Sequence, residues 1–450
     1  MTYPETIQYL ESLINYENIP IYPYKESLIL ERIKGFLEII NNPQDGLKCI
    51  HVAGTKGKGS TCAFIAYILR QAGYKVGLYT SPHLSDFRER VRILEPVFGN
   101  QQLKYDFEGM ISQEGIADIL GRLKPAIEIY NRGQEYGPLS FFEVYTSLAF
   151  VYFQEKKVDF AVLETGLGGR LDATNVVDPL VAVITPISYE HTQKLGNTLK
   201  EISAEKAGII KVRKFESSKV RKLIVVSAPQ EKAAREVIRK RCNETGAKLY
   251  EVGKDITCQK TKDGFKIKGV LGEYSNLKTK FFGGHQLINA AVAVGAIEGL
   301  QLHNVIIGIE AVGSGLYNTL WPGRCEVVSR SPLIVLDGAQ NIASSRALKE
   351  TIKQDFKYKR LVLVLGISSD KDIKGICQEL SGLADEVILT KSSNPRATEP
   401  ECLAQYFNGK AVHITHDVKE ARGEASRLSQ KEDLVLVCGS LFVVGEFRLS

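Results

Sequence analysis

The run from Ile50 to Thr61, IHVAGTKGKGST, constrains the fold of this chain more than any other segment. Its apolar residues predict the end of a buried strand, its glycines a tight turn, and the residues from Ser60 onward a helix. A glycine-rich turn between a strand and a helix points backbone N–H groups, and the positive end of the helix dipole, at an anion. Lys58 adds a point charge at phosphate distance, and Ser60 or Thr61 can ligate a metal ion. The run therefore predicts a loop that binds the phosphates of a nucleotide.

The spacing of this run differs from the common phosphate-loop pattern GxxxxGK[ST], because Gly59 separates Lys58 from Ser60. The alternative interpretation is a tight strand-to-helix turn that carries two surface lysines. The context favours the phosphate loop, since the predicted helix at 60–71 is followed by a second predicted strand at 76–80. Strand, loop, helix and strand is the arrangement that a phosphate loop needs.

The length and the charge of the chain limit its class. At 450 residues the chain is too long for one compact core, so we expect two domains. No apolar run reaches the ~18 residues that a membrane span needs, and the N-terminus, MTYPETI, lacks the apolar core of a signal peptide. We therefore expect a cytoplasmic protein with no membrane partner. The formal net charge of +6 suits acidic small molecules such as nucleotides and is too diffuse to indicate nucleic acid.

Strand-like and helix-like segments alternate along the first part of the chain. Short runs of Val, Ile and Leu between helical segments predict an α/β fold with a mostly parallel sheet buried on both faces. The strand candidates are 49–53, 76–80, 158–163, 181–185 and 223–227, and the helix candidates are 5–14, 28–39, 60–71, 141–154, 230–245 and 286–299. Residues 249–282 predict a small antiparallel β excursion packed on this domain.

A second alternating series begins near Trp321, with strand candidates at 333–336, 361–365, 386–390, 411–415 and 434–438. It predicts a separate, Rossmann-like α/β domain. We therefore predict a P-loop ATPase-like domain at 1–300 and a C-terminal Rossmann-like domain at 301–450. The link is expected near 299–316, where Gly308, Gly313 and Gly315 interrupt the helices.

Two residues that follow predicted strands are candidate metal ligands. Glu164 ends the apolar run 158–163, and an acid at the carboxyl end of a parallel strand beside a phosphate loop suits magnesium. The alternative is a carboxylate that caps the following turn. His191 lies just beyond another strand end. A histidine there is more often structural or surface-exposed, but a position at the same sheet edge as Glu164 makes it a plausible ligand.

Three further residues carry candidate roles that the chain alone leaves open. Lys206 lies in an apolar-flanked helical segment, either exposed and paired with an acid or turned inward and modified. Arg324 resembles a linker arginine that could neutralise a transferring phosphate; the alternative is a surface arginine. Asp337, at a predicted strand end, could bind a ribose hydroxyl.

A series of motifs runs in one order along nearly the whole chain. The motifs are GTKGKGS, TSPHL, SFFE, ETGLGGRLDATN, EKAGIIK, HQLINA, WPGR, LDGAQN, SDKD and CGSLF. Together they resemble the folylpolyglutamate synthase/dihydrofolate synthase family within the ATP-dependent Mur-ligase superfamily. Each motif alone is modest, but the ordered set is specific.

The resemblance implies a reaction and a set of site residues. ATP would phosphorylate a carboxylate of a pterin substrate, dihydropteroate or a reduced folate, and the amino group of L-glutamate would then displace phosphate to form an amide. The implied catalytic residues are Lys58, Glu164, His191, Lys206 and Arg324. The implied ATP contacts are Gly54, Thr55, Gly57, Lys58, Gly59, Ser60, Asn289, Arg324 and Asp337. The implied Mg²⁺ ligands are Ser81, Glu164 and His191, and the implied substrate contacts are Ser140, Phe141, Phe142, Glu143, Leu171, Asp172 and Ala173.

The resemblance also implies that Lys206 matches a lysine that is carbamylated in many relatives. This chain departs from the family pattern at two positions, with Glu190 where many relatives have aspartate and Gln340 where many have histidine. We expect a monomer. The alternatives to this folate ligase are a Mur-type ligase for another acid and amino acid, a P-loop ATPase without ligase activity, and a degenerate binding module.

Overall fold

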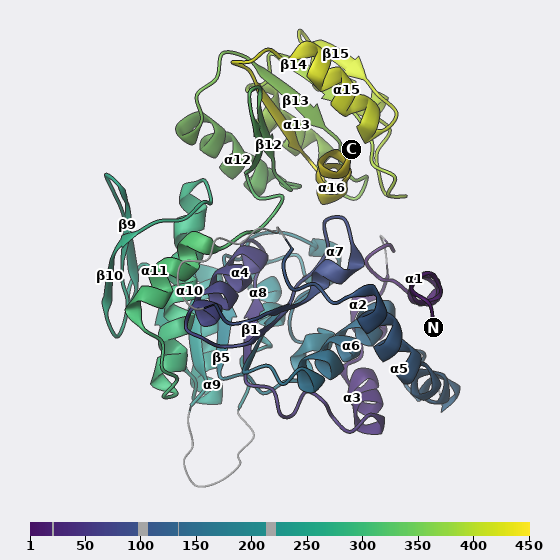
Figure 1. Cartoon of the computed structure of the whole chain (residues 1–450), viewed down its shortest axis with the longest axis vertical. Helices are drawn as coiled ribbons and strands as arrows, with labels where there is room; N and C mark the ends of the chain where they lie inside the picture. Colours follow the sequence, from purple (N-terminus) through teal and green to yellow (C-terminus); the bar gives the residue numbers. More distant parts are fainter. Residues whose placement is uncertain (20–21, 98–106, 134, 213–221) are drawn as a thin grey trace. The chain divides into compact units, whose positions relative to one another are not determined.

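The computed structural model describes residues 1–19, 22–97, 107–133, 135–212 and 222–450, which form two compact units (Figure 1). The first unit contains Met1–His83, Phe87–Lys280 and Leu287–Leu320, and the second contains Leu84–Asp86, Phe281–Gln286 and Trp321–Ser450. The units divide between Leu320 and Trp321, whereas the sequence prediction divides the chain after residue 300. Residue 300 lies inside a continuous helix, α10 (Gly284–Leu302).

The first unit contains a large sheet, a small sheet and helices between their strands. The strands are β1 (Cys49–Ala53), β2 (Val76–Tyr79), β3 (Val91–Leu94), β4 (Phe160–Glu164), β5 (Val181–Ile184), β6 (Ile224–Ser227), β7 (Lys248–Glu251), β8 (Thr257–Thr261), β9 (Gly264–Lys268) and β10 (Glu273–Leu277). The helices, with 3-10 turns η1 (Phe87–Arg90) and η2 (Ala173–Val176), are α1 (Tyr3–Ser12), α2 (Tyr24–Ser27), α3 (Leu30–Ile39), α4 (Lys58–Gln71), α5 (Gln113–Gly133), α6 (Phe141–Glu155), α7 (Thr192–Leu195), α8 (Leu199–Ala207), α9 (Lys232–Thr245), α10 and α11 (Ile309–Asn318).

The large sheet has the strand order β3-β2-β4-β1-β5-β6-β7. Every neighbouring pair is parallel except β2 with β3, which is antiparallel. The carboxyl ends of β1, β2, β4 and β5 therefore meet at one edge of the sheet, where ligands bind in open α/β folds. The predicted mostly parallel sheet is confirmed, and β7 joins it rather than the antiparallel excursion.

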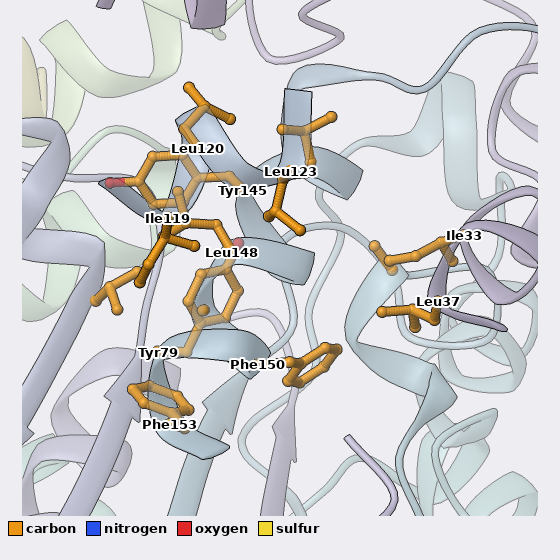
Figure 2. Packing of buried hydrophobic residues seen from close by; sticks show 14 of the residues in the cluster. Ile33, Leu37, Tyr79, Ile119, Leu120, Leu123, Tyr145, Leu148, Phe150 and Phe153 are labelled. Atoms are coloured by element: carbon orange, nitrogen blue, oxygen red, sulfur yellow. The ribbon is translucent and has the colours of Figure 1, made fainter. Parts of the chain in front are cut away.

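Helices cover both faces of this sheet, so its central strands are buried along their whole length. On one face, α3, α5 and α6 pack against β1, β2 and β4 in the apolar cluster of Figure 2, in which the ring of Tyr79 lies among side chains such as Leu148 and Phe153. On the other face, α4 packs against β1, β2 and β4, and α11 packs against α4.

Of the three glycines in the predicted link, Gly308 lies between α10 and α11 as predicted, whereas the other two lie in helical structure. Gly313 and Gly315 are inside α11, and a Cβ on Gly315 would lie 2.5 Å from the Cα atom of Ile68 in α4. Gly315 is therefore needed for close helix packing rather than for a connection. The predicted antiparallel excursion is the sheet β10-β9-β8, and β10 packs against α11 (Figure 1).

The second unit is built around a sheet of order β11-β12-β16-β13-β14-β15, parallel except for the antiparallel pair β11 and β12. Its elements are β11 (Glu326–Arg330), β12 (Leu333–Leu336), α12 (Ile342–Asp355), β13 (Leu361–Leu365), α13 (Ile373–Ser381), β14 (Glu386–Leu389), α14 (Glu401–Ala404), β15 (Ala411–Ile414), α15 (Val418–Leu428), β16 (Leu434–Cys438) and α16 (Leu441–Leu449). The predicted strands of this domain are confirmed to within a residue at their ends. No helix among the described residues of the chain is long and apolar enough to cross a membrane.

Candidate active site

The predicted phosphate loop connects β1 to α4 and has no room for side chains at two of its glycines. Gly57 precedes the first residue of α4 and has a φ of +81°, and a Cβ there would lie 2.2 Å from Oδ1 of Asn289. A Cβ on Gly54 would lie 1.9 Å from Oγ1 of Thr185. The first N–H groups of α4 have no partner within the helix, as at every helix N-terminus. The loop is therefore a backbone cradle that suits an anion.

Three predicted site residues meet at the carboxyl edge of the large sheet. Oε1 of Glu164, the last residue of β4, lies 3.9 Å from Nζ of Lys58 in the first turn of α4. Oε2 of the same carboxylate accepts a hydrogen bond of 3.3 Å from the backbone N–H of Ser81, which follows β2. Glu164 is only 5% exposed. The structure thus brings Lys58, Ser81 and Glu164 together from three different strand ends.

A second segment of the same edge, the turn after β5, lies along the phosphate loop. The backbone N–H groups of Thr55 and Lys56 both donate to the carbonyl oxygen of Pro186, at 3.0 and 3.1 Å. Nζ of Lys56 lies 3.1 Å from Oε1 of Glu190. The next residue, His191, is exposed and has a φ of +52°. His191 therefore lies in the turn that contacts the phosphate loop, at the sheet edge where the sequence predicts it.

The side chains at this edge fit a hard divalent cation. Among the described residues there is no group of three or more His, Cys, Asp and Glu side chains that could hold a metal ion by themselves. Oxygen donors are nevertheless concentrated there, because Oγ1 of Thr61, Oγ1 of Thr165 and Oγ of Ser188 are buried and have no hydrogen-bond partner among the described residues. These hydroxyls and the Glu164 carboxylate are oxygen groups of the kind that Mg²⁺ prefers, alongside phosphate oxygens and water.

Lys206 is turned inward, which excludes the exposed alternative and leaves its modification a prediction. It lies in α8, is 4% exposed, and its Nζ donates a hydrogen bond of 2.8 Å to the carbonyl oxygen of Gly54. Burial lowers the pKa of Lys206 to about 7, with a further lowering by the charge of Lys58. The side chain thus joins α8 to the phosphate loop with an amine that loses its proton near neutral pH.

The predicted substrate residues Ser140, Phe141, Phe142 and Glu143 lie at the start of α6. Ser140 caps this helix, and its hydroxyl donates to Oε2 of Glu143 at 2.6 Å. The Glu143 carboxylate also accepts hydrogen bonds of 2.8 and 2.9 Å from Nε of Arg32. Phe141 is buried in the core, whereas Phe142 is half-buried. A Cβ on Gly166 would lie 2.7 Å from the ring of Phe142, so this ring borders the loop after Glu164.

The second predicted substrate segment, Leu171-Asp172-Ala173, stabilises that same loop. Oδ2 of Asp172 accepts the N–H groups of Gly166 and Leu167, both at 2.9 Å, and Oδ1 accepts the N–H and hydroxyl of Thr174. Asp172 and Ala173 are buried, and burial raises the pKa of Asp172. Leu171 is half-buried. Phe142 and Leu171 are the partly exposed members of the predicted substrate set.

The remaining predicted ATP contacts divide between the units. Thr55 lies in the loop between β1 and α4, Gly59 and Ser60 lie in the first turn of α4, and Asn289 in α10 lies against Gly57. Arg324 and Asp337 lie in the second unit. The Asp337 carboxylate accepts the N–H groups of Cys325 and Ala339, both at 2.8 Å, and so fixes the turn after β12.

Sequence reasoning missed several residues of this region. Arg32 comes from an N-terminal helix, and nothing in its local pattern shows that it pairs with Glu143. Tyr24 donates a hydrogen bond of 3.3 Å to Glu205, next to Lys206. The sequence marks each member of the pair Lys56–Glu190, since Lys56 is a second lysine in the loop and Glu190 departs from the family pattern. It does not show that the two residues are paired.

The two units match two known domain families. Residues 137–297 match the Mur ligase middle domain, and residues 323–441 match the Mur ligase glutamate ligase domain. A phosphate loop with an adjoining carboxylate in the first unit and a Rossmann-like second unit define an ATP-dependent ligase of the Mur type.

Known proteins of this class resemble the chain over most of its length. It is 34% identical over 427 residues to the dihydrofolate synthase/folylpolyglutamate synthase of Bacillus subtilis, covering 93% of this chain and 94% of that protein. It is 33% identical to the Escherichia coli protein of the same description, covering 87% and 84%. The Mycobacterium tuberculosis folylpolyglutamate synthase complexed with ADP has a TM-score of 0.86 at 28% identity, covering 99% and 97%. The chain belongs to the folylpolyglutamate synthase/dihydrofolate synthase family of the Mur ligase superfamily, as the motifs indicate.

Proposed function

We propose that this ligase adds L-glutamate both to dihydropteroate and to reduced folates. The observation that supports the proposed site is the meeting of Lys58, Ser81 and Glu164 beside the first turn of α4. Two anions, a substrate carboxylate and ATP, must approach each other in such a reaction, so fixed positive charge and oriented N–H groups are needed at the point of transfer. The relatives from B. subtilis and E. coli are named for both activities, which supports the bifunctional assignment.

In the proposed reaction, a carboxylate oxygen of the pterin substrate attacks the γ-phosphorus of ATP. The bond between that phosphorus and the bridging oxygen breaks, which gives ADP and an acyl phosphate. The amino nitrogen of L-glutamate then attacks the acyl carbon, the amide bond forms, phosphate leaves, and the nitrogen loses a proton. The Lys58 ammonium balances charge on the phosphates, and the backbone cradle between Gly54 and Ser60 orients them.

Magnesium fits the oxygen donors of this edge. The carboxylate of Glu164 and the hydroxyls of Ser81 and Thr61 would hold it, with His191 as the further ligand that the resemblance implies. When bound, the ion would supply positive charge at the phosphates. ADP and AMPPCP in complexes of the M. tuberculosis relative support nucleotide binding by this loop.

A carbamate on Lys206 is a further part of the proposal. Only a neutral amine attacks carbon dioxide, and a pKa of about 7 gives Lys206 a neutral fraction at physiological pH. An increase in intact mass on exposure to bicarbonate, absent in Lys206→Met, supports this; an unchanged mass under conditions that preserve carbamates contradicts it.

Four further points stay predictions. They are the contacts of Arg324 and Asp337 with the nucleotide, those of Phe142 and Leu171 with a pterin, the monomeric state and the cytoplasmic location. A complex of the E. coli relative, FolC, with DHPP and ADP supports a pterin substrate for this fold.

The test is ADP release with ATP and Mg²⁺, omitting in turn L-glutamate, dihydropteroate and tetrahydrofolate, with product masses recorded. Glutamate-dependent release with each pterin supports the bifunctional assignment. Release with only one pterin contradicts bifunctionality and identifies the activity that is present. ADP release that ignores L-glutamate contradicts the ligase assignment.

A further inference from the structure

We propose that Lys56 and Glu190 are a positioning pair, in which the ion pair ties the turn after β5 to the phosphate loop and thereby fixes where His191 is presented to the metal ion of the bound nucleotide. The inference rests on the proposed nucleotide–magnesium site. Neither Lys56 nor Glu190 is a predicted metal ligand, so the proposed role of both residues is to position His191.

The loop and the turn are joined stepwise along their length. Pro186 accepts the N–H groups of Thr55 and Lys56. Two residues further on, the Thr55 hydroxyl donates to the carbonyl oxygen of Ser188 at 3.2 Å and accepts its N–H at 3.1 Å. Two residues further again, Nζ of Lys56 contacts Oε1 of Glu190 at 3.1 Å. The ion pair therefore fastens the part of the turn that adjoins His191.

His191 itself has a backbone conformation that needs support from its neighbours. Its φ of +52° lies in the left-handed region, which a residue with a Cβ adopts at a cost in free energy. On its C-terminal side, its carbonyl oxygen accepts the N–H groups of Lys194 and Leu195, both at 2.9 Å. On its N-terminal side, the paired Glu190 side chain adds to the bonds of Pro186 and Ser188 that hold the turn against the loop. Without the pair, the turn can relax and the imidazole moves with it.

The pair is partly shielded from water and acts in a cluster of charges. The side chains of Lys56 and Glu190 are 28% and 15% exposed, so solvent screens them less than a typical surface pair. Both residues act on the buried Lys206, whose pKa is lowered by Lys56 and raised by Glu190, in addition to the larger effects of burial and of Lys58. With Lys56 held by Glu190, Lys58 is the loop lysine that faces the Glu164 carboxylate.

The experiment measures ADP binding by titration calorimetry with and without Mg²⁺, and compares the ratio of the two affinities between variants. In Glu190→Gln we expect the enhancement by Mg²⁺ to fall about tenfold, as for other residues that orient a metal ligand. Lys56→Arg, which keeps the charge and the pair, is expected to retain the wild-type ratio. In Lys56→Gln/Glu190→Gln the ratio is expected to fall no further than in Glu190→Gln alone, because the two residues act as one unit.

The matched control is Glu155→Gln, which removes a carboxylate paired with Arg122 at 2.6 Å on the exposed surface of the same unit. An affinity ratio in Glu190→Gln equal to that of wild type and of this control overturns the positioning role. A ratio that falls further in Lys56→Gln/Glu190→Gln than in Glu190→Gln overturns it too, because the two residues then act independently. If Glu190→Gln fails to fold, Glu190→Asp takes its place, because it keeps the charge but shortens the reach. A lowered affinity ratio in Glu190→Asp supports the positioning role, and a wild-type ratio overturns it. A wild-type protein that binds ADP without any Mg²⁺ effect overturns the proposed site itself, whereas a normal wild type with an unaffected variant overturns only the pair.

Discussion

The amine of Lys206 and the backbone of Gly54 are joined by a hydrogen bond of 2.8 Å, from Nζ to the carbonyl oxygen. This bond links α8 to the first glycine of the phosphate loop, where a Cβ has no room. Because Lys206 is buried near Lys58, the protonated form is disfavoured and its pKa is lowered from 10.5 to about 7. The burial of Lys206 against the phosphate loop therefore makes the stability of the folded protein depend on pH.

Lys206→Met is expected to change how stability depends on pH. Between the folded pKa of about 7 and the ordinary value of 10.5, the unfolded chain holds the Lys206 proton and the folded protein does not. The unfolded state then binds more protons, so the contribution of Lys206 to the free energy of unfolding rises as pH rises through this window. The free energy of unfolding of Lys206→Met minus that of wild type should be largest near about pH 6 and smaller near about pH 9. Urea unfolding in carbonate-free buffer measures it, and an equal difference at both pH values would contradict the lowered pKa.

Glu164→Gln is expected to lower glutamate-dependent ADP release by more than about tenfold, which corresponds to ~1.4 kcal/mol in the barrier. Glutamine keeps the size of the side chain and can still accept the N–H of Ser81, but it lacks the charge that faces Lys58 and that would bind magnesium. Steady-state turnover at saturating ATP is the measurement, with Glu155→Gln as the control that removes an exposed carboxylate. Activity within tenfold of wild type would show that Glu164 is not a metal ligand.

The alternation of apolar runs and helical segments was sufficient to predict the layers of the fold. Strand β1 has the predicted bounds Cys49–Ala53, and the other central strands differ by a residue or two, because a strand buried on both faces is a continuous apolar run. Edge elements lack that signal. Strand β11 (Glu326–Arg330) is half-exposed and was not predicted. Helix α5 contains Pro125, and a proline lacks the backbone N–H that a helix interior needs, so its presence disfavours the prediction of a helix there.

The candidate site was predictable where chemistry and strand ends coincide. Lys58, Ser81 and Glu164 follow or end separate strands of one parallel sheet, so topology alone brings them to one edge. The partners of a side chain across the fold carry no such pattern. The contacts of Arg32 with Glu143 and of Lys56 with Glu190 join positions far apart in the chain, and only the folded backbone specifies them.

Asp172→Asn is expected to lower the free energy of unfolding by about 2 kcal/mol. The carboxylate accepts N–H groups from Gly166, Leu167 and Thr174, and an amide offers one acceptor oxygen and a donor group that faces donors. Denaturant unfolding gives the difference, and Asp118→Asn, on the exposed face of α5, is the control expected to stay within about 0.5 kcal/mol of wild type. An unchanged stability together with weaker folate binding would assign Asp172 to the substrate instead of to the loop.

Gly315→Ala and Gly313→Ala are expected to change stability in opposite directions, although both lie in α11. A Cβ on Gly315 would lie 2.5 Å from the Cα atom of Ile68, so α11 and α4 must separate, at a cost of about 2 kcal/mol. At Gly313 the nearest atom, Cδ2 of Leu277, would be 3.8 Å away, so alanine only restricts the unfolded chain and favours the helix, which adds about 0.5 kcal/mol. Denaturant midpoints of the two variants measure the contrast. Equal effects would mean that the contact between α11 and α4 adjusts without cost, because the two substitutions differ in little besides that contact.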